Sequence, residues 1–220
     1  MNTNSSSRLP RSLAALAAVV ALVGAACGGS DEADQSSDPT EVVDADSASL
    51  SQTAPIEVDG EPLAPYGETP EDPSIGTASP VITGQAFDGS PVTIGEETEN
   101  PTFVVFLAHW CPACNEELPE LVELAESDSY PEGLDVLAVA TATTDERDNF
   151  PPSEWLDDAG WPFPVMADSV EAEAFVAMGG TSFPYGVVLD ADGTVLARTV
   201  GVRPGADTVA FLEDALATAG

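Results

Sequence analysis

The sequence contains no lysine, and its five arginines stand against 39 aspartates and glutamates, which gives a formal net charge of −34 at pH 7. Two of the five, Arg8 and Arg11, lie close to the N-terminus, so the rest of the chain has very little positive charge. A surface of this sign repels nucleic-acid phosphates and anionic lipid headgroups. We therefore expect no nucleic-acid partner. The acidity fits a role in solubility, with an acid-mediated docking surface as the alternative.

Residues that bind metals through nitrogen or sulfur are also scarce, because the chain has one histidine and three cysteines. A structural zinc site needs about four ligands. Cys111, Cys114 and the neighbouring His109 supply at most three, so we expect no metal, and the sequence implies no nucleotide or flavin cofactor. The third cysteine, Cys27, needs a separate explanation.

Long apolar runs are missing as well, since residues 13–26 fall short of the roughly 20 residues that a transmembrane helix needs. Arg8 and Arg11 precede this run, and small residues followed by Cys27 end it, which is typical of a signal peptide. The junction resembles the bacterial lipoprotein signal, which implies that Cys27 becomes the lipid-modified first residue of the mature chain. We therefore expect a signal peptide over 1–26 and an exported protein, lipid-anchored at the extracytoplasmic face of the cell membrane. A secreted protein with an unmodified Cys27 is the alternative.

Residues 27–79 are rich in Asp, Glu, Ser, Thr and Pro and show no lasting hydrophobic periodicity. Such a composition buries too little apolar surface to offset the entropy lost on ordering, so we expect a disordered acidic tether. A flexible chain of about 50 residues has a root-mean-square reach of roughly 40 Å. This reach suits a lipid-anchored domain that meets partners beside a membrane.

Strand and helix signals alternate over residues 80–220, which we expect to form one folded domain. The expected strands are 81–83, 91–94, 102–107, 134–140, 163–166, 185–189 and 194–200. The expected helices are 111–127, 153–159 with Ser153 as its N-cap, 170–178 and 206–219. This order is typical of an α/β sandwich with a mixed sheet.

The sequence HWCPAC occupies residues 109–114, where a buried strand is expected to end and a helix to begin. Two cysteines separated by two residues can close a small disulfide when a helix start brings their side chains together. The unpaired N–H groups and partial positive charge of a helix N-terminus favour a thiolate. We therefore expect Cys111 to attack a partner disulfide and Cys114, one turn inward, to resolve the mixed disulfide.

Two other uses of this cysteine pair stay open at this point. A static disulfide would also account for two cysteines in an oxidising compartment. Cu(I) binding by Cys111 and Cys114 with His109 is another alternative, because soft thiolates suit Cu(I). The redox interpretation is favoured by the position of the pair between a strand and a helix.

This motif resembles the thioredoxin superfamily, and in particular the exported TlpA/ResA-like thiol–disulfide oxidoreductases. The resemblance covers about residues 80–220 and rests on FVVFLAHWCPAC (103–114), EELP (116–119) and FPYGVVLD (183–190). It implies a thioredoxin-like sandwich, with a mixed central sheet, helices on both faces and an N-terminal β-hairpin.

The resemblance also implies a substrate-binding surface around the cysteines. Pro184 would be the cis-proline that faces the active-site disulfide. Phe183 would then line the surface where a substrate peptide pairs as an extra strand. We expect Trp110 to cover one side of the disulfide and to complete this surface.

Glu117 follows Cys114 by three residues, so a helix places both on the same face. In the TlpA/ResA-like group the glutamate at this place is an active-site acid, which implies that Glu117 exchanges protons with Cys114. The alternative is a solvated side chain, as expected for Glu116. His109 is either a cation that stabilises the Cys111 thiolate or a bystander on an exposed rim.

We therefore interpret the chain as an exported thiol–disulfide oxidoreductase that exchanges electrons between Cys111 and Cys114 and the cysteines of other proteins. The resemblance suggests a reductant, for example in cytochrome c maturation, supplied with electrons by a membrane thiol carrier. A disulfide-forming oxidase is the first alternative. A Cu(I)-binding protein that uses the same pair is the second.

Overall fold

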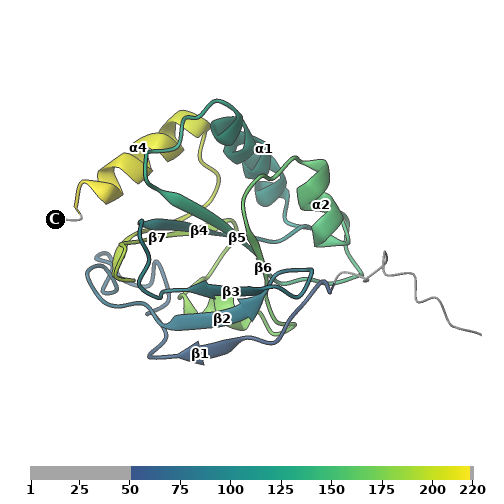
Figure 1. The fold of residues 1–220 in the computed structure, drawn as a ribbon, viewed down its shortest axis with the longest axis horizontal. Helices are drawn as coiled ribbons and strands as arrows, with labels where there is room; N and C mark the ends of the chain where they lie inside the picture. Colours follow the sequence, from purple (N-terminus) through teal and green to yellow (C-terminus); the bar gives the residue numbers. More distant parts are fainter. Residues whose placement is uncertain (1–50, 219–220) are drawn as a thin grey trace, which may run out of the picture. The chain divides into compact units, whose positions relative to one another are not determined.

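One mixed β-sheet organises residues 51–218, the part of the chain that the computed structural model describes (Figure 1). Its strands are β1 (Glu57–Asp59), β2 (Val81–Gln85), β3 (Pro91–Ile94), β4 (Thr102–Leu107), β5 (Asp135–Ala140), β6 (Val165–Ala167), β7 (Tyr185–Leu189) and β8 (Val195–Val200). Their order in space is β1-β2-β6-β5-β4-β7-β8, with β3 paired to β2. Because β4 pairs in parallel with β5 and antiparallel with β7, the sheet is mixed, as expected.

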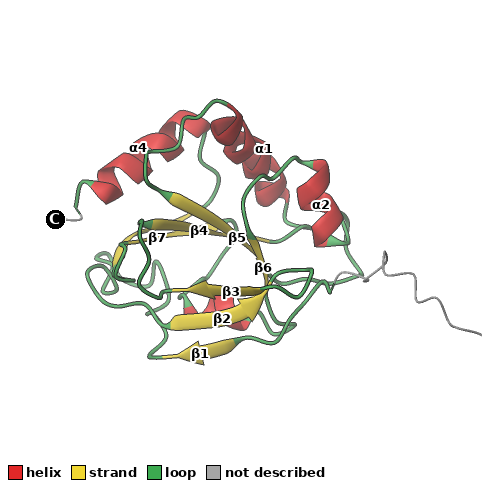
Figure 2. Cartoon of the chain, viewed as in Figure 1, coloured by secondary structure: helices red, strands yellow, loops and turns green. Residues whose placement is uncertain are grey.

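Helices cover both faces of this sheet. Those of the described residues are α1 (Pro112–Glu126), α2 (Pro152–Asp158), α3 (Glu173–Ala177) and α4 (Gly205–Leu216). α1, α2 and α4 lie on one face and α3 lies on the other (Figure 2). β2 and β3 form the expected N-terminal hairpin. The order of elements from residue 80 onward therefore agrees with the order that the sequence predicts.

The central strand β4 shows why helices are needed on both faces. Successive side chains of a strand point to opposite sides. Val104 and Phe106 pack into the core on the α3 side, whereas Phe103, Val105 and Leu107 pack into the core under α1, α2 and α4. All five side chains are buried. A strand buried on both faces must be apolar throughout. This continuous apolar run is the pattern that predicts the strand from the sequence.

α3 is shorter than the helix expected over 170–178. The residues before it are organised by Asp168, whose buried carboxylate accepts hydrogen bonds from the backbone N–H groups of Ser169 (2.8 Å), Ala174 (2.9 Å) and Phe175 (3.2 Å). The bonds from Ala174 and Phe175 satisfy N–H groups of the first helical turn, which have no partner within the helix. The chain before Glu173 therefore forms a turn around a carboxylate, and the helix begins only after it.

α2 also begins differently from the expectation. Its N-cap residue is Pro151, which makes no side-chain capping bond. Ser153, predicted as the N-cap, lies inside the helix, and its N–H donates to the side-chain carbonyl of Gln52 at 3.1 Å. A residue distant in sequence thus satisfies an N–H group of the first helical turn, which no local side chain caps.

The tether expected as far as residue 79 is shorter in the structure, because residues 51–79 are part of the fold. β1 pairs antiparallel with β2, and the side chains of Ala54 and Leu63 are buried. Apolar residues of this stretch are few and irregularly spaced, so no strand or helix period appears in the sequence. The folded part therefore begins before residue 80. The expected signal peptide, the lipidation of Cys27 and the remaining tether lie outside the described residues.

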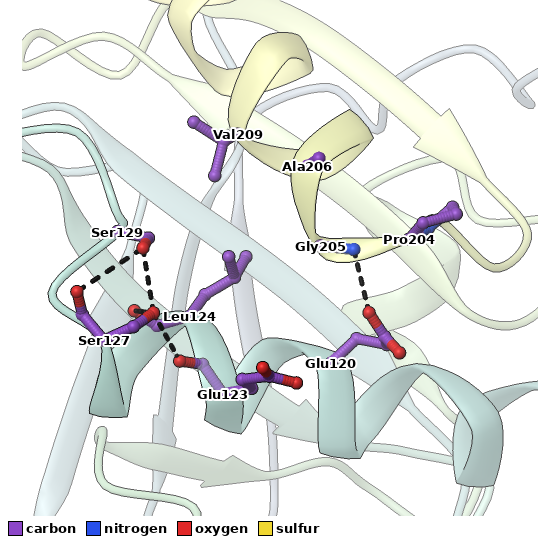
Figure 3. Close-up of a pocket in the computed structure, with 9 residues that line it drawn as sticks. All are labelled: Glu120, Glu123, Leu124, Ser127, Ser129, Pro204, Gly205, Ala206 and Val209. Atoms are coloured by element: carbon purple, nitrogen blue, oxygen red, sulfur yellow. Dashed lines mark hydrogen bonds between the residues drawn. The ribbon is translucent and has the colours of Figure 1, made fainter.

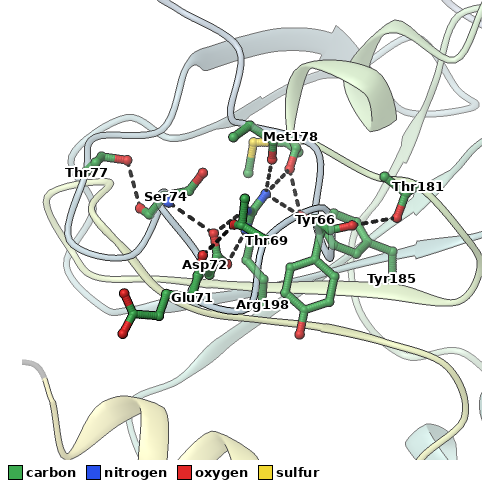
Figure 4. A network of polar contacts seen from close by, with 11 residues as sticks. Tyr66, Thr69, Glu71, Asp72, Ser74, Thr77, Met178, Thr181, Tyr185 and Arg198 are labelled. Carbon is green, nitrogen blue, oxygen red and sulfur yellow. Dashed lines mark hydrogen bonds and ion pairs between the residues drawn. The ribbon is translucent and has the colours of Figure 1, made fainter.

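Arg198 of β8 ties this N-terminal stretch to the sheet from a fully buried position (Figure 4). Its guanidinium donates to both carboxylate oxygens of Asp72, from Nε at 2.8 Å and from Nη2, and to the Ala64 carbonyl at 2.8 Å. It also donates to the Tyr185 hydroxyl, which in turn donates to the Met178 carbonyl at 2.7 Å. Burial opposes ionisation of Asp72, but the hydrogen bond from Arg198 holds the pKa of that carboxyl below its ordinary value.

Replacing Asp72 with asparagine is expected to lower the free energy of unfolding by about 3 kcal/mol at pH 7, because the buried charge of Arg198 loses its partner. The difference should shrink in acid, where the wild type also loses the pair as the pH falls through the lowered pKa of Asp72. Glu71→Gln removes an exposed charge one residue away and should change stability by less than about 0.5 kcal/mol. Urea unfolding at pH 7 and in acid measures the free energy of unfolding of both variants. If Asp72→Asn and Glu71→Gln lose the same stability at pH 7, the ion pair of Asp72 with Arg198 does not stabilise the fold.

Candidate active site

Cys111 and Cys114 lie at the junction of β4 and α1. Cys111 is the N-cap residue of α1 and has an extended backbone, and Pro112 follows in the first turn, where its missing N–H costs little. No disulfide joins Cys111 to Cys114 in the structure. Cys111 is 9% exposed and Cys114 is 0% exposed, so a partner that approaches the pair meets Cys111 first.

The Cys114 thiol is enclosed at the start of α1. Its Sγ accepts a hydrogen bond from the backbone N–H of Ala108 at 3.4 Å. Burial raises the pKa of this thiol well above its ordinary value, the Ala108 bond opposes that rise, and the charges of Cys111 and Glu117 add to it. Because the thiolate is the nucleophile, Cys114 needs a group that takes its proton before it can react.

Glu117 supplies a titratable carboxyl on the same face of α1. Its side chain is buried, whereas that of its neighbour Glu116 is exposed. Burial raises the pKa of Glu117 from 4.5 to about 7, against the opposing effects of the backbone N–H and the charge of Arg203. Such a carboxyl is about half ionised at neutral pH and can take or return a proton there.

The residues expected to bind substrate lie together around Cys111. The peptide bond between Phe183 and Pro184 is cis, and the Phe183 carbonyl oxygen is 4.0 Å from the Cys111 Sγ. The ring of Trp110 packs edge-on against that of Phe183, with centroids 6.0 Å apart. The fold thus brings residues more than 70 positions apart in the sequence to the Cys111 thiol.

The structure agrees with neither of the two roles that the sequence left open for His109. Its side chain is buried rather than on an exposed rim. Its Nδ1 is 2.7 Å from the carbonyl oxygen of Asp148, which can only accept, so Nδ1 carries the proton. Its Nε2 accepts a hydrogen bond from the backbone N–H of Thr144 at 3.4 Å. Both ring nitrogens of the neutral imidazole therefore bind the chain around 144–148, and neither is free to act on Cys111.

Sequence reasoning missed Asn115, the residue after the second cysteine. Its Nδ2 donates to the carbonyls of Cys111 (2.8 Å) and His109 (3.0 Å). Its Oδ1 accepts from the side chains of Asn149 (3.0 Å) and Trp155 (2.9 Å). Asn115 therefore joins the first turn of α1 to α2 and to the loop before it. A sequence pattern predicts that an asparagine in a first helical turn faces solvent. Nothing in the sequence therefore indicates that Asn115 connects α1 to α2.

A groove of about 680 Å³ lies between α1 and the start of α4 (Figure 3). At one end the Glu120 carboxylate accepts a hydrogen bond from the backbone N–H of Gly205 at 2.9 Å. Neither Cys111 nor Cys114 lines this groove. It is therefore separate from the site that the cysteines form.

What the described residues bring together at Cys111 is a second thiol, a titratable carboxyl and an aromatic rim. Within residues 51–218, no group of three or more His, Cys, Asp and Glu side chains is placed to hold a metal ion. No helix of this same stretch is long and apolar enough to cross a membrane.

Comparison with known sequences gives both a family and relatives. The Redoxin family model matches residues 74–216. Methylamine utilization protein MauD from Methylobacillus flagellatus is 32% identical over 139 residues, which are 61% of this chain and 62% of that protein. MauD from Paracoccus denitrificans is 31% identical over 132 residues, which are 59% and 60%. The chain thus spans about three fifths of the length of these curated relatives.

Solved structures share the fold. A thiol:disulfide interchange protein of the thioredoxin family from Chlorobium tepidum TLS is 26% identical, with a TM-score of 0.51 over 64% of this chain and 97% of that one. StoA from Bacillus subtilis is 16% identical, with a TM-score of 0.51 over 63% of this chain and 98% of that one, and is similar in fold alone. These similarities confirm the thioredoxin-like α/β fold predicted from the sequence.

Proposed function

The chain belongs to the Redoxin family and has a thioredoxin-like fold, and on this premise we propose that it is a thiol–disulfide oxidoreductase whose redox pair is Cys111 and Cys114. One observation carries the proposal. The more exposed thiol belongs to the N-cap residue of α1, beside a cis-proline, and the second thiol is buried in the first turn of that helix. This arrangement lets the Cys111 sulfur react with a partner while the Cys114 sulfur stays buried and inaccessible to that partner.

The exchange proceeds in two balanced steps. The Cys111 thiolate attacks one sulfur of a partner disulfide, forming a mixed disulfide and releasing the other partner sulfur as a thiolate. Cys114, after losing its proton, attacks the Cys111 sulfur and releases the second partner thiolate. The partner gains two electrons, and Cys111 and Cys114 are left as a disulfide. Glu117, close enough for its charge to raise the pKa of Cys114, takes the Cys114 proton in this second step.

The partner would be a polypeptide bound at the surface that Trp110, Phe183 and Pro184 form. The Phe183 backbone, whose carbonyl oxygen faces the Cys111 Sγ, would pair with such a segment as an added strand. Proteins with cysteines or disulfides are therefore the proposed substrates. No cofactor enters the reaction, because both electrons come from the two thiols.

We assign the reductive direction, in which the protein supplies electrons to exported proteins, with cytochrome c maturation as an example. The buried Cys114 thiol supports this direction, because burial and the charge of Glu117 both disfavour its thiolate. The reduced pair therefore lacks the stabilisation that makes a pair a strong oxidant. A membrane thiol carrier would then reduce the Cys111–Cys114 disulfide again. Lipid attachment at Cys27, supported by the sequence around it, would keep the protein beside such a carrier at the extracytoplasmic face.

A redox titration tests this function and its direction. The chain with Cys27→Ser would be equilibrated in thiol buffers and followed by tryptophan fluorescence and thiol alkylation. A two-electron midpoint near or below about −270 mV supports a reductant, whereas one near about −120 mV assigns a disulfide-forming oxidase. If no reversible transition occurs and the reduced protein binds one Cu(I), the copper-binding alternative replaces the proposal.

A further inference from the structure

The loop from β5 to α2, residues 141–151, contacts the chain that leads into α1, and we name it the rim loop. Hydrogen bonds tie it to two consecutive residues, His109 and Trp110. They run from Trp110 Nε1 to the Ala142 carbonyl (2.8 Å), from the Thr144 N–H to His109 Nε2 (3.4 Å), from His109 Nδ1 to the Asp148 carbonyl (2.7 Å) and from Asn149 Nδ2 to the His109 carbonyl (2.9 Å). The rim loop is thus fixed on both sides of Arg147.

Arg147 projects from the rim loop onto Trp110. Its guanidinium carbon is 4.9 Å from the centroid of the indole ring. Trp110 in turn packs against Phe183, whose carbonyl oxygen is 4.0 Å from the Cys111 Sγ. The stacking on Trp110 therefore places a cation beside the surface that a partner of Cys111 must contact.

Arg147 has no anionic partner of its own in the described part of the chain. The one ion pair there joins Arg198 to Asp72. Arg203 belongs to the segment before α4, where it stacks on Phe211. Arg147 is exposed and forms no hydrogen bond through its side chain to the described residues, although the chain has 39 acids. Its five N–H donors are therefore available to a molecule that binds from outside.

We propose that Arg147 is a specificity-determining residue that binds a carboxylate of the partner polypeptide, from an Asp or Glu close to the cysteine that reacts with Cys111. This inference rests on the proposed function. A guanidinium stacked on an indole keeps its edge free, and that edge presents a planar fork of donors that matches a carboxylate. The stack also limits the orientations of the side chain, so less freedom is lost when the carboxylate binds.

The negative charge of the rest of the chain restricts where an acidic residue of a partner can bind. A net charge of −34 repels an acidic peptide as a whole. An acid in the peptide is therefore favoured only where it meets Arg147, and an acid placed elsewhere is disfavoured. The partner class that fits is a polypeptide with its acid at a defined position near the reactive cysteine.

The test compares three disulfide peptides of one sequence in which the residue beside the cysteine is Glu, Gln or Lys. Rates of reaction with the reduced chain carrying Cys27→Ser are measured for the wild type, Arg147→Gln and Arg147→Lys. Arg147→Gln should slow the Glu peptide about fivefold relative to the Gln peptide and should not slow the Lys peptide. Arg147→Lys should keep part of the preference, and high salt should reduce it.

Two controls separate this role from others. Asn100→Asp makes the same change in net charge at the opposite end of β4 and should leave the ratio of Glu to Gln rates unchanged. The pH profile of Cys111 alkylation by iodoacetamide should be the same for Arg147→Gln and the wild type. If Arg147→Gln slows all three peptides equally, or leaves the ratio unchanged, the inference is wrong while the proposed function stands. If no peptide reacts with the wild type, both are wrong.

Discussion

Cys111→Ser is expected to lower the rate of partner disulfide reduction by about three orders of magnitude or more, because it removes the attacking sulfur. Cys114→Ser should behave differently. It leaves the first step intact, so the variant should accumulate a stable mixed disulfide between Cys111 and the partner. The burial of Cys114 explains the difference, since a partner cannot reach that position directly.

The two variants are best compared in a chain with Cys27→Ser, which leaves no other thiol. A disulfide peptide with a mass tag would be added, and the adducts would be counted by mass spectrometry after acid quenching. We expect an adduct with Cys114→Ser, none with Cys111→Ser, and only a transient one with both cysteines present. An adduct on Cys111→Ser in equal or higher yield would contradict the proposed first step, because it would show that a partner reaches Cys114 directly.

The sequence predicts best those elements whose every residue must be apolar. The strand expected at 102–107 has these bounds in the structure, as does the strand at 185–189, because each is buried on both faces. β1 contrasts with them. Its three residues, Glu57–Asp59, are exposed, and pairing with β2 orders them. Backbone pairing leaves no side-chain periodicity in the sequence, so composition alone predicts that this stretch belongs to the tether.

At the candidate site, local spacing revealed the cysteines but not the residues around them. No arginine lies within thirty positions of Cys111, yet Arg147 stacks on the adjacent Trp110. The reason is the parallel pairing of β4 with β5, in which Leu107 is opposite Ala140. Parallel strands end at the same edge of a sheet, so the chain that follows each of them meets there. The burial of His109 has the same cause.

Glu117→Gln is expected to make the folded protein more stable while it slows the reaction. The carboxyl has a pKa of about 7 in the folded protein and 4.5 when unperturbed. Between these values the folded state holds a proton that the unfolded state has released, so stability falls as the pH rises. Each pH unit is worth about 1.4 kcal/mol, so the cost above pH 7 is about 3 kcal/mol. Glutamine, which stays neutral, avoids this cost.

Urea unfolding across the pH range measures the stability effect. Glu117→Gln should exceed the wild type by about 3 kcal/mol at pH 8 and match it near pH 4, where Glu117 is protonated in both states. Glu116→Gln, which alters the exposed neighbour, should change stability by less than about 0.5 kcal/mol at either pH. A gain at pH 8 that persists unchanged at pH 4 would mean that the stabilisation does not come from the proton.

The kinetic effect of Glu117→Gln should appear only in the second step of the exchange. Attack of Cys111 on the partner needs no proton from Glu117, so mixed disulfide should form at the wild-type rate. Release of the second partner thiol should slow by about a hundredfold, since general-base assistance contributes factors of this size. In the wild type this rate should rise with pH through about 7, as Glu117 ionises. If the variant keeps that rise, another group takes the Cys114 proton; if it loses the rise and gains stability, the same buried charge causes both effects.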